Sequence, residues 1–130
     1  MLAAVQTAHG VFTVDVEEDA VLELDDGARL EAPQVETGLP RVVAAAATGA
    51  TVIAVVDRRP PLAISNDAGR TWREAGGGLP AGRAVAIAED DPDLVLYGAR
   101  NRLYVSRDGG RFWEALTLEL PEIERVTWLP

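Results

Sequence analysis

The sequence predicts an all-β fold of β-propeller blades, with about three four-stranded blades in the 130-residue chain. Two repeated features lead to this prediction. Leu-Pro pairs recur 40 and 41 residues apart, at Leu39-Pro40, Leu79-Pro80 and Leu120-Pro121. The segments Ser65–Trp72 and Ser106–Trp113 lie 41 residues apart and share Ser, Asp, Gly and Trp in register. Four short strands in about 40 residues is the period of a propeller blade.

The strands are clearest in the last two repeats, residues 41–80 and 81–121. In the first of these we expect strands at 42–47, 51–56, 62–65 and 71–75. In the second we expect them at 84–88, 94–98, 103–106 and 112–116, with an acidic turn at Glu89–Asp93. Short apolar runs bounded by Gly, Pro, Asn and Asp are typical of strands, and no segment keeps a helical period.

Residues 1–40 form a degenerate version of the same unit. Leu2–Gln6 is the expected second strand of a blade, and residues 7–15 align with the turn and third strand of the last repeat. The Ser-Asp segment is reduced there to Val14-Asp15-Val16. Val21–Leu24 and Arg29–Ala32 are candidates for the outer hairpin.

Residues 1–130 form one domain, but the chain does not begin and end at the boundaries between blades. The chain begins at the second strand of a blade, whereas residues 122–130, with Val126–Leu129, supply the first strand of a neighbouring blade. An open arc of three blades would expose apolar faces and unpaired edges. We therefore expect a homodimer in which each chain completes the first blade of the other, giving a six-bladed ring. A larger ring, a fragment or a non-propeller sheet are the alternatives.

The Ser-Asp-Gly-Trp segments have a structural explanation. An Asp carboxylate can accept hydrogen bonds from the turn that follows it, and Gly allows the positive φ that closes a hairpin. The Trp can then cover the hairpin. A nucleophilic role is disfavoured because the single His, His9, lies in another repeat. We expect eight structural residues: Ser65, Asp67, Gly69, Trp72, Ser106, Asp108, Gly110 and Trp113.

These two segments resemble the Asp-box (BNR) repeat family. Phe112 departs from the usual Thr of that motif, and Ala68 from a frequent Gly. The family includes sialidases, xyloglucan-cleaving hydrolases, sortilin-type receptors and photosystem II assembly-factor-like proteins, all of them β-propellers. The resemblance therefore implies the fold strongly and the activity hardly at all.

The composition excludes several classes of function. Cysteine is absent, which removes disulfides, thiolate zinc sites and cysteine nucleophiles. A net charge of −9 argues against nucleic-acid binding. No apolar run is long enough to cross a membrane, and the N-terminus lacks a signal-peptide pattern, so we expect a soluble cytoplasmic protein. No cofactor is expected, and no metal site, because the spacing of Asp90–Asp93 matches no calcium loop.

Catalysis is a weaker functional hypothesis than binding, and a purely structural assembly part is a third possibility. A glycosidase needs two converging carboxylates, but the acidic residues cluster in turns. The sialidase resemblance requires a Tyr nucleophile, yet Tyr97 and Tyr104 both lie inside expected strands. A glycoside hydrolase-like enzyme with a site shared across the dimer remains the alternative function.

The leading hypothesis is a non-catalytic binding or scaffold module with an Arg-rich face. All 12 basic residues other than His are Arg. Turns between second and third strands, and entries to first strands, share one face of a propeller. The candidates there are His9, Arg41, Arg58, Arg59, Arg83, Arg100, Arg102 and Arg125. Guanidinium groups suit carboxylate, sulfate or phosphate, so the expected partners are an anionic small molecule, a glycan or an acidic protein surface.

Overall fold

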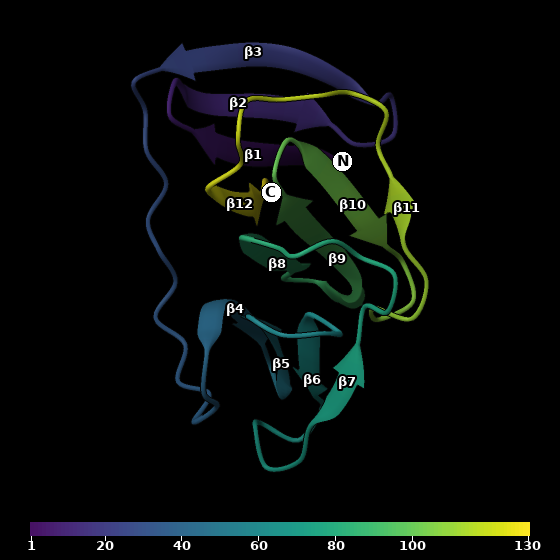
Figure 1. Cartoon of the computed structure of the whole chain (residues 1–130). Helices are drawn as coiled ribbons and strands as arrows, with labels where there is room; N and C mark the ends of the chain where they lie inside the picture. Colours follow the sequence, from purple (N-terminus) through teal and green to yellow (C-terminus); the bar gives the residue numbers. More distant parts are fainter.

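The computed structural model describes residues 1–130 as three four-stranded antiparallel sheets without a helix (Figure 1). The first sheet has the order β12-β1-β2-β3, with bounds Arg125–Trp128, Leu2–Thr7, Gly10–Asp15 and Ala20–Asp26. The second contains β4 to β7, at Val42–Thr48, Thr51–Val56, Leu62–Ser65 and Arg73–Ala75. The third contains β8 to β11, at Ala84–Ala88, Asp91–Ala99, Arg102–Ser106 and Glu114–Ala115. The all-β prediction is confirmed.

Most expected strands lie within a few residues of the observed ones. The outer strands β7 and β11 are shorter than expected, because the hairpin turns before them extend to residues 72 and 113. β9 begins at Asp91, inside the expected acidic turn, with a register shift opposite Ile87 and Ala88. The expected strand at Arg29–Ala32 is wrong, since these residues pair with no sheet edge.

The two ends of the chain meet in the first sheet. β12 is antiparallel to β1, from Ala3 opposite Trp128 to Gln6 opposite Arg125. We expected this strand to complete the first sheet of a second chain, but here it completes the sheet of its own chain. The spatial order of the sheets is therefore second, third, first, with the third in the middle (Figure 1).

Two apolar clusters hold the third sheet between its neighbours. One joins it to the first sheet through residues such as Leu96, Leu103 and Val5. The other joins it to the second sheet and includes Ile53, Ile64 and the fully buried Tyr97. Because neighbouring residues of a strand point to opposite faces, β9 supplies both clusters.

Residues 27–41, which we call the strap, return the chain from the first sheet to the second. The strap joins β3 to β4 and runs along one side of all three sheets (Figure 1). It is longer than the other connections between sheets, residues 76–83 and 116–124. Its Val35 and Leu39 pack on the outer face of the second sheet. The outer apolar face of the second sheet, one of those that an open arc would expose, is thus covered within the chain.

Gly82 lies so close to the Tyr97 ring that one added methyl group should destabilise the fold. A Cβ at this position would overlap the ring of Tyr97, whose hydroxyl donates a hydrogen bond to the Pro80 carbonyl oxygen over 2.7 Å. Gly82→Ala should therefore lower the free energy of unfolding by about 1–3 kcal/mol, the usual cost of overpacking.

The matched control is Gly77→Ala, because nothing lies within 4 Å of a Cβ there. Urea denaturation of both variants is the measurement. Equal effects of the two substitutions would contradict the proposed packing around Tyr97.

Candidate functional site

The turn after β6 is locked by the hydrogen bonds of two side chains. The Ser65 hydroxyl donates to Asp67 Oδ1 over 2.8 Å and accepts from the Gly69 amide over 2.8 Å. Asp67 also accepts from the amide and hydroxyl of Thr71, at 2.8 and 2.6 Å. These bonds, led by that of the Thr71 hydroxyl, lower the pKa of Asp67 from 3.8 to about 2.

The turn after β10 repeats this geometry. Ser106 donates to Asp108 Oδ1 over 2.8 Å and accepts from the Gly110 amide over 2.8 Å. Phe112, at the position of Thr71, donates its amide hydrogen bond to Asp108 over 3.0 Å, and the residue is 79% exposed. The amide of Phe112 and then the Ser106 hydroxyl hold the pKa of Asp108 below its usual value. Both Ser-Asp pairs thus bond to their own turns.

Glycine and tryptophan complete the two turns. Gly69 and Gly110 have φ of 88° and 92°, in the region that favours glycine. Trp113 Nε1 donates to the Gly110 carbonyl oxygen over 3.0 Å, and its ring lies 5.8 Å from that of Tyr97. Trp72 packs on the outer face of the second sheet. A structural role accounts for every one of these contacts.

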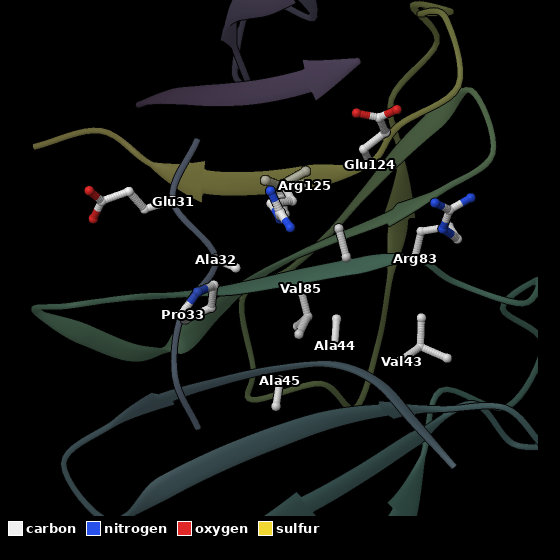
Figure 2. A pocket seen from close by; sticks show the side chains of 12 residues that line it. Glu31, Ala32, Pro33, Val43, Ala44, Ala45, Arg83, Val85, Glu124 and Arg125 are labelled. Carbon is white, nitrogen blue, oxygen red and sulfur yellow. The ribbon is translucent and has the colours of Figure 1, made fainter. Parts of the chain in front are cut away.

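A cavity of about 340 Å³ lies where the first residues of β4, β8 and β12 meet the strap (Figure 2). Its apolar lining includes Val43, Ala45 and Val85. Its charged lining consists of Glu31, Arg83, Glu124 and Arg125. Figure 2 shows Arg125 between β12 and β8, whereas Glu31 is directed away from it. The same ends of the three innermost strands therefore surround one opening.

Glu124 anchors the strap to the first sheet. Its carboxylate accepts from Gln6 Nε2 over 3.0 Å and from Arg29 over 2.9 Å, and Gln6 Oε1 accepts from the Leu30 amide over 2.6 Å. The Gln6 bond has the largest effect and lowers the pKa of Glu124; desolvation comes next and opposes it, and Arg29 adds to the lowering, so the pKa lies below its usual value. A general acid at neutral pH needs a raised pKa, so Glu124 is unsuited to that role.

The register brings the predicted Arg positions to one end of the sheets. The turn at Arg58 and Arg59 is level with the start of β4, since the Asp57 amide bonds to the Arg41 carbonyl oxygen. The turn at Arg100 is likewise level with the start of β8, and that at His9 with the start of β12. We call this end, with its eight candidate side chains, the Arg end. Those side chains are His9, Arg41, Arg58, Arg59, Arg83, Arg100, Arg102 and Arg125.

The eight side chains do not converge on a single point. Arg83 and Arg125 line the cavity. Arg83 pairs with Glu122 at 3.5 Å, and Arg102 pairs with Glu119 at 3.1 Å. The other Arg residues of the Arg end make no ion pair, and they are exposed together with His9. The Arg end is thus a broad surface around the cavity.

Neither of the two tyrosines is freely exposed. Tyr97 is fully buried, and burial, with a smaller contribution from Tyr104, raises the pKa of its hydroxyl far above the usual value. Tyr104 is half-buried, with its ring 6.1 Å from that of Tyr97.

No group of three or more His, Asp or Glu side chains is arranged to hold a metal ion. The structure contains no helix long and apolar enough to span a membrane.

Sequence analysis missed the side chains that tie distant segments together. Asp19 accepts hydrogen bonds from the Thr117 amide and hydroxyl, both at 2.7 Å, and from the Leu118 amide at 3.0 Å. Burial alone would raise its pKa, but these bonds lower it overall. Asp19 thereby fastens the first sheet to the third. Gln6 and Glu124 were missed for the same reason, because no local motif marks them.

The lowered pKa of Asp67 predicts acid sensitivity. A carboxylate with a depressed pKa in the folded state stabilises the fold above its unfolded pKa, and this contribution disappears as the pH falls through the folded pKa. Asp67→Asn should therefore lower Tm at pH 7. It should also lose less stability than the parent between pH 3.8 and about 2.

Thermal unfolding monitored by circular dichroism across this pH range is the measurement. Asp57→Asn is the control, because the Asp57 side chain is exposed and makes no hydrogen bond or ion pair. An unchanged pH profile in Asp67→Asn would contradict the turn lock.

Comparison with solved structures supports the fold. A chain from a structure titled "YCF48 bound to D1 peptide", a β-propeller, matches with a TM-score of 0.53 and 20% sequence identity. The match covers 94% of this chain and 42% of that one, so this chain spans less than half of its length. No protein-family model and no curated protein sequence matches the chain. The three sheets therefore have the architecture of β-propeller blades.

Proposed function

We propose that this protein is a non-catalytic β-propeller binding module whose Arg end engages an acidic segment of a protein partner. One observation carries the proposal. Arg41, Arg58, Arg59, Arg100 and Arg125 are exposed at the same end of the sheets and form no ion pair, although the chain carries a net charge of −9. An acidic protein offers many carboxylates of its own, so guanidinium groups that lack a carboxylate partner on one surface favour binding of an external anion. Of the five, Arg125 does donate a hydrogen bond, to the Leu30 carbonyl oxygen over 3.3 Å.

Backbone strain supports a role for these positions. Four non-glycine residues have positive φ, and two of them are Arg41 at 60° and Arg100 at 54°. The left-handed conformation costs roughly 1 kcal/mol for such residues, whereas glycine adopts it freely. An arginine kept where glycine would fit better is consistent with a side chain that serves in binding.

The choice of a protein partner over a small anion rests on two features. The Arg end is broad, since its unpaired side chains come from three separate sheets. A β-propeller of similar fold has been solved with a peptide bound, as its title states. An anionic small molecule or a glycan would instead bind at one compact site, and both are outcomes of the test below.

We also propose that the two Ser-Asp turns are Asp-box repeats. The equivalent hydrogen bonds of Ser65 with Asp67 and of Ser106 with Asp108 support this assignment. A sialidase-type hydrolase is the weaker candidate, because Tyr97 is buried and Glu124 is already engaged by Gln6 and Arg29.

Charge reversal at the Arg end tests the binding proposal. The probe is a fluorescein-labelled ten-residue peptide of alternating Glu and Gly, with a Lys-Gly peptide for comparison. Arg58→Glu combined with Arg100→Glu should weaken binding of the acidic peptide at least about tenfold, because attraction becomes repulsion. Fluorescence anisotropy gives the Kd of each variant.

Arg70→Glu combined with Arg107→Glu is the matched control, since both residues are exposed near the opposite ends of β6 and β10 and the net charge changes equally. Arg100→Gly separates binding from stability, because it should weaken binding without lowering Tm. Equal loss in both double variants would overturn the proposal. Tight binding of free phosphate or sialic acid, but not of the peptide, would replace the partner with a small anion.

The sequence predicted a homodimer of the full chain, whereas β12 here pairs with β1 of its own chain, so we propose the dimer as an alternative arrangement. We propose that two chains can exchange β12 to form a six-bladed ring, and that the strap decides between this dimer and the closed single chain. In the ring the strap would join two neighbouring sheets, and it would then need no more residues than the connection 76–83, which also joins neighbouring sheets. A strap that spans three sheets needs more, since each residue reaches at most about 3.6 Å.

Deletion of residues 31–37 leaves a connection as long as 76–83 and should convert the protein to a dimer. Light scattering after size exclusion should give 13.9 kDa for the full chain and twice the chain mass for the shortened one. A folded, monomeric shortened chain would contradict control by the strap.

A further inference from the structure

The outer strand of the first sheet differs from its counterparts. β3 has 7 residues, whereas the outer strands β7 and β11 have 3 and 2. Three of its large aliphatic side chains are solvent-exposed: Val21 by 43%, Leu22 by 55% and Leu24 by 43%. A short outer strand protects a sheet against pairing with other chains, whereas the length and exposed aliphatic side chains of β3 leave it with its acidic residues as the main protection.

The outward edge of β3 has open hydrogen-bonding groups. Its inner edge pairs with β2, from Gly10 opposite Asp26 to Asp15 opposite Ala20. Outside this pairing, its backbone makes a single bond, in which the Ala28 amide donates to the Asp25 carbonyl oxygen. The amides and carbonyls along the rest of that edge are therefore free to pair with an added strand.

The charge of β3 identifies the kind of strand it would accept. Glu23, Asp25 and Asp26 are exposed acids without an ion-pair partner, and β3 contains no basic residue. A second copy of β3 would bring like charges together across the new pair, which is unfavourable. A basic strand would pair its cations with these carboxylates and lay its own apolar side chains beside the exposed aliphatic ones.

We propose that β3 is a docking edge for an extended basic segment of a partner protein, in which Lys or Arg alternates with aliphatic residues. The segment binds by adding a fifth strand outside β3. This site is separate from the Arg end in its charge, its strand and its partner, so neither proposal depends on the other.

The probe is a seven-residue peptide of alternating Lys and Val with blocked ends, titrated into the 15N-labelled full chain. Binding should shift the amide resonances of β3 and slow their hydrogen exchange. Two further peptides carry N-methyl groups on alternate amides: one is methylated at the odd-numbered residues and the other at the even-numbered residues. Because an added strand turns alternate amides toward its neighbour, one methylated peptide should lose binding and the other should retain it.

Charge reversal on β3 is the second test of the proposal. Glu23→Arg combined with Asp25→Arg should weaken binding of the Lys-Val peptide at least about tenfold. The matched control is Glu89→Arg combined with Asp90→Arg, which changes the net charge equally in an exposed turn outside the first sheet.

Three results would overturn the proposal. Equal binding of both methylated peptides would show attraction by charge alone. Unchanged binding to the β3 variant would place the peptide elsewhere. Self-association of the chain through β3, seen as a concentration-dependent mass that the β3 variant alters, would make a second copy the occupant.

Discussion

The pairing of β12 with β1 is the interaction on which the rest of the structure depends. It gives the first sheet its innermost strand and joins residues 2–7 to residues 125–128. It also builds the third wall of the cavity, because Glu124 and Arg125 enter the lining at the start of β12. Without this pairing the first sheet would lose its innermost strand, which is the strand that lies against β8 and β9 of the third sheet.

The strap is the consequence of that closure. Since β12 follows the third sheet, pairing it with β1 places the first sheet beyond the third, and the chain must then return to the second. Residues 27–41 make this return, held by Gln6 and Glu124 at one end and by Val35 and Leu39 on the second sheet. One segment therefore both connects the sheets and covers an apolar face.

The local features were predictable because they repeat. The strands of residues 41–121 follow from alternating apolar runs and turn residues, and the Ser-Asp turns follow from two copies of one pattern. The strap and Asp19 were not predictable. Asp19 bonds to Thr117, 98 residues away, and residues 29–32 are held in the strap by bonds of Arg29 with Glu124 and of Leu30 with Gln6 instead of pairing with β3. Such contacts depend on the assembled fold, which leaves no local signature.

The polar side chains fall into two groups, those that bond within the fold and those that are exposed. The Ser-Asp turns use their polar atoms within their own hairpins, whereas the arginines and the acidic edge of β3 that we propose for binding are exposed.

One chain closes its own first sheet through β12, and an engineered disulfide tests this closure. The chain has no cysteine, so Ala4→Cys with Thr127→Cys introduces a single pair at opposed positions. Opposed Cα atoms lie about 4.5–5.5 Å apart, within disulfide range. After oxidation, denaturing non-reducing electrophoresis should show a monomer containing an internal disulfide; a disulfide-linked dimer would contradict closure within the chain.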